Sequence, residues 1–322
     1  MMLVTGATGF VGRALVSKLL TKDCQIKALV RKVSTYLPFE IEQVVVDLGE
    51  IEGDGSIKAT LSGVDVVVHA AARVHIMQDR SANPLDEFRK LNRDMTLALA
   101  ELAADEGVKR FVFLSSIGVN GNNSVMPFSE KDAPNPQEPY AISKYEAEQG
   151  LLVLAKKTSM QVVIIRPPLV YGPNAPGNFG TLVNWLRRVV PLPLGAINNK
   201  RSFVALDNLV SFTALCADRT RSPKAANQVF LISDGEDVST TQLLRKVADA
   251  LGKKRWLLPV PVGLMSFVAR LIGKGDVANR LFGSLQVDSS KARDLLGWQP
   301  VITMDDQLHQ IVAADLKNEK TL

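Results

Sequence analysis

Three side chains near the middle of the chain combine the types and spacing of an acid–base site: Ser116, Tyr140 and Lys144. Residues four apart lie on the same face of a helix, so Tyr140 and Lys144 can address one ligand. A phenol with a pKa of about 10 is a poor acid–base group at neutral pH, but a nearby ammonium favours the phenolate and lowers that pKa. We expect Ser116 to hydrogen-bond a substrate oxygen and Tyr140 to exchange a proton with it while a hydride leaves or reaches the substrate carbon.

The predicted elements around these residues place them where a ligand would bind. The apolar run 110–116 predicts a strand that ends at Ser116, and Tyr140 opens a predicted helix, 140–157, behind Pro139, a residue suited to a first helical turn. Open α/β sheets bind ligands at the carboxyl ends of their strands. The competing interpretation is a serine cap and a surface lysine, because a Tyr-x-x-x-Lys spacing alone carries little information.

A glycine-rich turn at the start of the chain points to a dinucleotide as the hydride carrier. An apolar run of strand length ends at Thr5, and Gly6, Gly9 and Gly12 follow, with Val11, Leu15 and Leu19 at helical spacing behind them. Glycines allow a sharp turn and a close approach of the backbone, and the helix N-terminus can then hold a pyrophosphate. The alternative is a strand-to-helix turn without a ligand. Lys144 could bind the ribose next to a nicotinamide.

The alternation of apolar runs and helical patterns predicts an α/β protein with a Rossmann-type doubly wound parallel sheet. We expect residues 1–166 to form the dinucleotide-binding domain and 167–322 a smaller, mostly helical substrate lobe, with the segment 229–233 returning to the sheet. Besides the strands ending at Thr5 and Ser116, strands are predicted at 25–30, 44–46, 64–69 and 162–166. Helices are predicted at 85–106, 140–157, 179–189, 208–217, 240–251 and 262–272.

The composition is that of an ordinary globular protein of 322 residues, with 46% hydrophobic and 22% charged residues. The net charge of +5 is spread along the chain, which favours a solvated surface over nucleic-acid binding. The two cysteines and three histidines have no metal-ligand spacing, so we expect no metal site and reduced thiols in a cytoplasmic protein. A strand starting at residue 1 leads us to expect no signal peptide, and no apolar run reaches the ~20 residues of a membrane span.

With these motifs in place, the chain resembles the extended short-chain dehydrogenases/reductases, in particular the NAD-dependent epimerase/dehydratase group acting on nucleotide sugars. Residues 5–12 are similar to the cofactor loop of this family, 47–48 to its adenine-side acidic position and 69–72 to its cofactor-facing strand end. Asn92 matches a structural asparagine, residues 166–173 the signature beside the nicotinamide, and 288–298 the C-terminal signature.

The resemblance implies a role for each matching residue. Ser116, Tyr140 and Lys144 match the catalytic trio. The implied cofactor-binding residues are Gly6, Thr8, Gly9, Phe10, Val11, Asp47, Leu48, Ala70, Ala71, Ala72, Lys144 and Pro167. The implied substrate-binding residues are Ser116, Tyr140, Asn178, Arg201 and Arg280, with the arginine at 201 on the diphosphate of a nucleotide sugar. The family also implies a homodimer, built through the helices at 85–106 and 140–157.

Two departures from the family pattern guide the choice of cofactor and reaction. The strand end at 29–32 carries Arg31 where enzymes that use NAD place a carboxylate, so we expect NADP to be preferred and NAD to be the alternative. Ile117 and Gly118 stand where dehydratases of the group place an acidic pair, which excludes dehydration. We therefore expect a reductase of 4-keto-6-deoxy-N-acetylhexosamine nucleotides in bacterial polysaccharide (O-antigen) biosynthesis.

Three alternatives to this function remain open. The first is a UDP-hexose or UDP-N-acetylhexosamine 4-epimerase, the second an enzyme like the hydroxysteroid dehydrogenases or dihydroflavonol reductases, and the third a dinucleotide-binding module without activity. The second would need an apolar pocket. An apolar stripe formed by Leu264, Phe267, Val268 and Leu271 could line one or lie on a membrane surface, but we expect it to be ordinary core.

Overall fold

The parallel sheet at the centre of the molecule has the strand order β3-β2-β1-β4-β5-β6-β9. The computed structural model describes residues 1–21, 24–47, 49, 55–73, 83–188, 190–254, 256–273 and 275–319. All neighbouring strands in this sheet pair in parallel. The strands are β1 (Met2–Thr5), β2 (Ile26–Val30), β3 (Glu42–Val45), β4 (Val66–His69), β5 (Arg110–Leu114), β6 (Gln161–Arg166) and β9 (Gln228–Leu231).

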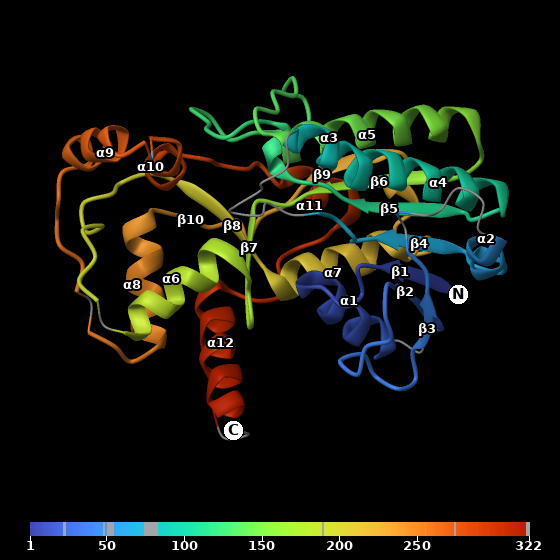
Figure 1. The fold of residues 1–322 in the computed structure, drawn as a ribbon, viewed down its shortest axis with the longest axis horizontal. Coiled ribbons are helices and arrows are strands. Elements are labelled where there is room, and N and C mark those ends of the chain that lie inside the picture. Colours follow the sequence, from blue (N-terminus) through green and yellow to red (C-terminus); the bar gives the residue numbers. More distant parts are fainter. Residues whose placement is uncertain are drawn as a thin grey trace.

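Helices cover both faces of the sheet, as a doubly wound fold requires (Figure 1). On one face, α1 (Phe10–Leu20) packs beside α7 (Leu206–Ala217). On the other face lie α2 (Gly55–Leu61), α4 (Met95–Asp105) and α5 (Pro139–Lys157). Except for the edge strand β3, the strands are largely buried on both sides, which explains their near-continuous Val, Ile and Leu runs. The expected Rossmann-type architecture is confirmed.

Residues after 167 build a second region and also return to the first. β9 pairs with β6, so one segment of the later chain does join the parallel sheet. Side chains of α7 belong to the core beneath that sheet, together with Trp298 near the C-terminus. The sequence pattern 208–217 underestimated this helix, which begins at Leu206 and buries most of its residues.

The second region contains a small sheet that the sequence did not predict. Its strands are β10 (Asp237–Val238), β8 (Arg201–Ala205) and β7 (Leu169–Tyr171), in that order. The helices around it are α6 (Gly177–Arg187), α8 (Thr240–Ala250), α9 (Val262–Leu271), α10 (Gly275–Phe282) and α12 (Met304–Glu319). The remaining helix, α11 (Ser290–Leu296), packs against β9 of the parallel sheet. Its core includes Tyr171, Phe203, Leu244 and Leu308.

The long helix predicted at 85–106 is interrupted by a turn of π-helix. α3 (Pro84–Arg89) continues into π-helical residues Lys90–Asp94 and then into α4. Gly107 follows α4 with φ +78°, the left-handed conformation typical of the residue after a helix end. Asn92 lies in the π turn and is fully buried.

The apolar stripe on α9 is exposed, so its assignment to the core is wrong. Phe267 and Leu271 are 61% and 71% exposed, and Leu264 and Val268 are also exposed. The helix contacts the rest of the protein with a different face, through Val262 and Met265. Within the described residues, no helix is both long and apolar enough to cross a bilayer.

Candidate active site

The glycine loop brings the ends of β1 and β4 into contact. Gly6 has φ +68°, and a Cβ built on it would lie 2.6 Å from the Ala71 nitrogen, so only glycine fits. A Cβ on Gly12 would lie 2.0 Å from the Gly6 oxygen, which explains why α1 can start directly on the loop. Gly9 is the N-cap of α1 and has no side chain that could accept a hydrogen bond. The N–H groups of the first helical turn, which contains Phe10 and Val11, are therefore available to a ligand.

These features fit a dinucleotide. The first-turn N–H groups of α1 lie beside the carboxyl ends of β1 and β4, where a pyrophosphate is held in this architecture. Thr8 lies in the turn and is exposed, while Ala70 and Ala71 are half-buried and Ala72 is exposed at the end of β4. The sequence-predicted loop residues are therefore brought together at one edge of the sheet.

A chain of hydrogen bonds runs beneath this loop through His69. Thr5 Oγ1 lies 2.8 Å from His69 Nδ1, and His69 Nε2 lies 3.0 Å from Thr96 Oγ1. Thr96 donates its own proton to the Asn92 carbonyl at 2.8 Å, so its oxygen accepts from His69 Nε2. We infer a neutral imidazole protonated on Nε2, with Nδ1 accepting from Thr5. Burial lowers the pKa of His69 to about 3, in agreement with a neutral ring.

Asn92 fastens the segment after β4 to the helix that carries Tyr140. Its Oδ1 accepts from the Arg73 N–H at 2.8 Å, and its Nδ2 donates to the Arg73 carbonyl at 3.1 Å and to Ser143 Oγ at 3.1 Å. Ser143 in turn donates to the Tyr140 carbonyl at 2.8 Å. The structural role that the family resemblance implies for Asn92 thus has a physical basis: it links the loop after β4 to the first turn of α5.

Ser116 follows β5 and caps a short 3₁₀ helix, Ile117–Val119. Its Oγ accepts the Gly118 N–H at 3.1 Å, so its hydroxyl proton is still available to a substrate oxygen. A Cβ built on Gly118 would lie 3.2 Å from Ala141 Cβ and 3.4 Å from Ser116 Oγ. Ser116 therefore lies close to the start of α5, as the proposed acid–base site requires.

Tyr140 lies in the first turn of α5. Its ring packs edge-on against Phe88, with the ring centres 6.1 Å apart. Burial raises the pKa of Tyr140 to about 12, whereas the sequence led us to expect a lowered value, and this expectation is wrong for the protein without ligands. The physical reason is that withdrawal of the phenol from water disfavours the phenolate.

Lys144 is buried one helical turn further on. Its ammonium donates to the Leu114 carbonyl at 2.9 Å and lies 4.4 Å from the centre of the Phe113 ring. Burial lowers the pKa of Lys144 to about 7, a shift that the charge of Glu148 opposes. The lysine is therefore anchored at the end of β5 beside Ser116, with further donors for a ligand.

A buried ion pair below Lys144 was missed by the sequence reasoning. Glu148 and Arg166 form a bidentate salt bridge: Arg166 Nε lies 3.0 Å from Glu148 Oε1, and Arg166 Nη2 lies 2.5 Å from Glu148 Oε2. Ser115 Oγ also donates to Glu148, and Arg166 Nη1 donates to Asn120 Oδ1 at 2.9 Å. The i to i+4 spacing from Lys144 to Glu148 was the available signal, but it equally describes an exposed pair.

The residues expected at the adenosine end lie at the edge of the sheet. Arg31 and Lys32 are exposed directly after β2, and Asp47 is exposed after β3. Asp47 Oδ1 accepts from the Gly49 N–H at 2.9 Å. Leu48 lies outside the described residues.

Of the residues expected to bind the diphosphate of a nucleotide sugar, Arg201 and Arg280 lie close together. Arg201 donates through Nη1 to the carbonyls of Arg280 and Gly283, the latter at 3.1 Å. Arg280 forms an ion pair of 2.8 Å with Glu138, two residues before Tyr140. Pro167 accepts from the Ile117 N–H at 2.9 Å, beside Ser116. Asn178 lies in the first turn of α6, and its side chain is outside the described part of the structure.

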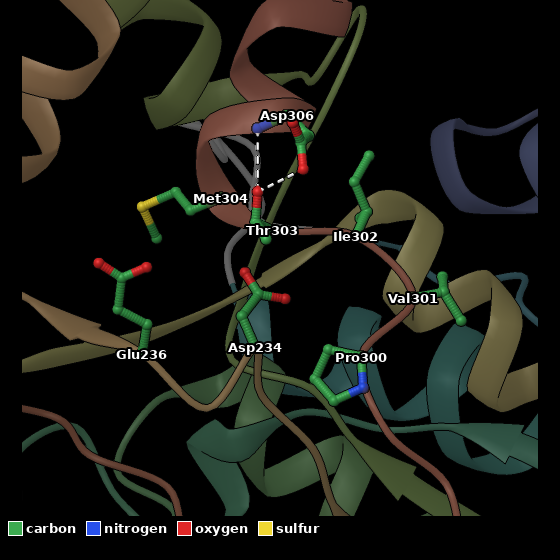
Figure 2. Close-up of a pocket in the computed structure, with 8 residues that line it drawn as sticks. All are labelled: Asp234, Glu236, Pro300, Val301, Ile302, Thr303, Met304 and Asp306. Carbon is green, nitrogen blue, oxygen red and sulfur yellow. Dashed lines mark hydrogen bonds between the residues drawn. The ribbon is translucent and has the colours of Figure 1, made fainter.

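A separate acidic pocket of about 260 Å³ lies in the C-terminal region (Figure 2). Asp234 and Glu236 line one side and the start of α12 the other, where Thr303 donates to Asp306 at 2.6 Å. Asp234 accepts hydrogen bonds from Tyr171, Asn208 and the Ala205 N–H. This carboxylate holds the small sheet and α7 together, and none of the pocket residues belongs to the acid–base site.

Comparison with known proteins gives the family. The model of the NAD dependent epimerase/dehydratase family matches residues 2–232. A UDP-glucose 4-epimerase of Vibrio cholerae is 44% identical over 319 residues, covering 98% of this chain and 95% of that protein. The chain therefore belongs to the NAD-dependent epimerase/dehydratase family.

Further relatives and solved structures agree with this assignment. An N-acetyl-alpha-D-glucosaminyl-diphospho-ditrans,octacis-undecaprenol 4-epimerase of Escherichia coli O157:H7 is 29% identical over 267 residues, covering 82% of this chain and 76% of that protein. A Thermotoga maritima UDP-glucose 4-epimerase, solved with UDP-glucose, superposes with a TM-score of 0.79 at 24% identity and covers 99% of both chains. A Bacillus cereus UDP-glucuronic acid 4-epimerase, solved with NAD, gives a TM-score of 0.79 at 21% identity and 98% of both chains.

Family and site together define the class of protein. It is an NAD-dependent enzyme of the short-chain dehydrogenase/reductase type, an epimerase or a reductase. Ile117 and Gly118, the two residues after Ser116, supply no carboxylate for the removal of water.

Proposed function

We propose that the enzyme is a 4-epimerase of UDP-hexoses or UDP-N-acetylhexosamines. The observation that carries this proposal is the 44% identity, over nearly the whole chain, to a UDP-glucose 4-epimerase. The presence of Ser116, Tyr140 and Lys144 on adjoining elements supports it. The reductase that we first expected from the sequence is therefore the second candidate.

The proposed reaction uses each member of the trio at a stated atom. Tyr140 takes the proton from the hydroxyl on C4 of the sugar while the hydride leaves C4, which gives a 4-keto sugar. A nicotinamide bound at this site would accept the hydride and, when oxidised, would supply a positive charge. Tyr140 returns the proton to the keto oxygen when the hydride comes back to the opposite face of C4. Ser116 donates a hydrogen bond to this oxygen throughout.

Lys144 and the groups around it prepare Tyr140 for this role. In the protein alone, burial raises the pKa of Tyr140, so the phenol holds its proton. An ammonium at Lys144, together with the positive charge of the oxidised cofactor, would favour the phenolate. Glu148 stabilises the charged form of Lys144.

The second candidate, a 4-keto reductase that prefers NADP, is favoured by one observation. Arg31 and Lys32 are exposed at the end of β2, where a carboxylate would bind the ribose of NAD. A guanidinium can pair with the 2′-phosphate of NADP. We propose that Arg31 makes this contact in either type of enzyme. Michaelis constants for both cofactors in the wild type and in Arg31→Ala test it, and an unchanged NADP to NAD ratio would contradict it.

We propose that Arg201, Arg280 and Asn178 bind the nucleotide of the substrate. Asp47 and Leu48 bind the adenine side of the cofactor in this proposal. We also propose a cytoplasmic homodimer formed through the helices at 85–106 and 140–157. A role in polysaccharide biosynthesis is supported by the undecaprenol-linked substrate in the name of the E. coli relative. The steroid-type enzyme and the inactive module receive less support, because the Vibrio relative is named for a nucleotide sugar.

A product assay separates the two main candidates. The purified protein is incubated with UDP-glucose and with UDP-N-acetylglucosamine, without cofactor and with NAD or NADP, and the 4-epimers are separated by chromatography. An epimerase forms the 4-epimer without net consumption of cofactor. Oxidation of NADPH by a 4-keto-6-deoxy nucleotide sugar, with no epimer from either UDP-sugar, would replace the epimerase by the reductase.

The role of Tyr140 is tested in the same assay. Tyr140→Phe should lower kcat by about 10²–10⁴-fold, because the acid–base group is lost. Tyr145→Phe, on the same helix, is the matched control and should retain the wild-type rate. An unaffected rate in Tyr140→Phe would remove this residue from the mechanism.

A further inference from the structure

The exposed stripe on α9 is unusual because its spacing is that of a buried helix face. Leu264, Phe267, Val268, Leu271 and Ile272 follow the i, i+3, i+4, i+7, i+8 pattern, and all five are exposed. None of the residues of α9 is buried. The helix lies at the edge of the molecule remote from the parallel sheet (Figure 1).

The segment before α9 adds two apolar side chains and is held in place by backbone hydrogen bonds. The Leu192 N–H donates to the Trp256 carbonyl at 2.9 Å, and the Leu258 N–H donates to the Leu192 carbonyl at 2.8 Å. Leu257 packs against the C-terminal core, whereas Trp256 and Leu258 on either side of it are exposed. Trp256 and Leu258 are therefore exposed although their backbone is hydrogen-bonded to a neighbouring segment.

Charge indicates what this surface contacts. Between Asp249 and Asp276 the chain has five basic residues and no acidic one. Lys253, Lys254 and Arg270 are exposed. Exposed apolar side chains combined with basic residues are typical of helices that lie in the interface of anionic membranes.

We propose that α9, with Trp256 and Leu258, docks the enzyme on the surface of an anionic lipid bilayer. The axis of α9 would lie along the membrane surface, with its apolar stripe among the acyl chains and the basic residues at the headgroups. A second copy of the chain is a poorer occupant, because a symmetric contact through this face would bring the basic residues of both copies together. The inference holds for an epimerase and a reductase alike and goes beyond either activity.

Vesicle co-sedimentation of the full-length enzyme tests the proposal. Wild-type protein should pellet with vesicles of phosphatidylcholine and phosphatidylglycerol, should do so less as salt is raised, and should stay in solution with phosphatidylcholine alone. Phe267→Ser/Leu271→Ser should lower the partition coefficient at least about tenfold. Lys253→Ser/Lys254→Ser should lower binding to the anionic vesicles.

Matched variants control for general effects. Phe39→Ser removes an aromatic side chain that is 92% exposed on the nucleotide-binding side, and Lys156→Ser/Lys157→Ser removes two exposed lysines at the end of α5. Both should bind vesicles like the wild type, and all variants should keep the thermal unfolding midpoint of the wild type. In a Trp185→Phe background, the emission of Trp256 should shift to the blue on anionic vesicles, because Trp298 is already buried.

Three results would overturn the proposal. The first is wild-type protein that stays in solution with every vesicle. The second is a loss of binding in the Phe39 or Lys156/Lys157 controls equal to that in the α9 variants. The third is a fall in molar mass by light scattering for Phe267→Ser/Leu271→Ser with vesicle binding unchanged, which would assign the stripe to an interface between copies.

Discussion

Acid sensitivity of the fold should originate in large part at His69. The imidazole is buried, and its two nitrogens are already committed to Thr5 and Thr96. Protonation of Nδ1 would require the Thr5 hydroxyl to turn away while a charge is left in the core. Replacement of His69 by Gln removes the titrating group and keeps a side chain that can both donate and accept.

The magnitude follows from the two pKa values of the imidazole. The folded protein holds the pKa of His69 at about 3, against 6.5 for the ordinary group. The unfolded chain therefore binds more protons than the folded one between these values, so stability is complete above pH 6.5 and is lost as the pH falls toward 3. Between pH 7.5 and 5, this one site should lower the free energy of unfolding by about 2 kcal/mol.

Urea unfolding at the two pH values measures this effect. The wild type should lose about 2 kcal/mol more than His69→Gln when the pH is lowered, since the other titrating groups are common to both proteins. His309→Gln, with an exposed histidine replaced on α12, should show the wild-type loss. Equal losses in the wild type and His69→Gln would refute the assignment of a neutral, buried His69.

Three further predictions concern the supports of the site. Glu148→Gln should lower the free energy of unfolding in urea by about 3–5 kcal/mol, because Arg166 is left buried without a counter-charge. The double variant Glu148→Gln/Arg166→Met should recover part of this loss. Gly6→Ala should weaken dinucleotide binding and lower the thermal midpoint more than Gly63→Ala does. Both glycines have positive φ, but a Cβ on Gly63 meets nothing within 4 Å, so equal effects in calorimetry would exclude the predicted clash. Asn92→Leu should cost about 2–4 kcal/mol by urea unfolding, because the Arg73 backbone loses its partner, and a change below about 0.5 kcal/mol would contradict this.

The parts of the structure that depend on local sequence were predictable. The continuous apolar strands and Pro139 in a first helical turn have the expected places. Lys144 reaches the Leu114 carbonyl at the end of β5, two residues before Ser116, because the topology of the fold places the start of α5 at the carboxyl ends of the strands.

The features that could not be predicted depend on tertiary contacts and burial. β7 and β10 have only three and two residues, too few for a strand pattern. β8 begins with two polar residues, Arg201 and Ser202, so its apolar part is only three residues long. The pKa of Tyr140 depends on how deeply the phenol is buried, which spacing cannot give. Periodicity showed that α9 has an apolar face, but the face with Val262 and Met265 is the one that contacts the core.

The π turn at Lys90–Asp94 fixes the rotational phase between two parts of one helix. An extra residue in a helical turn rotates everything before it by about 100° relative to everything after it. This offset lets α3 direct Phe88 at Tyr140 while α4 directs Leu99 and Ala103 at the sheet. A deletion of one residue from this turn would leave a continuous helix of good propensity, yet it would swing Phe88 off the phenol. The length of the helix, counted to a single residue, is therefore itself a determinant of the site.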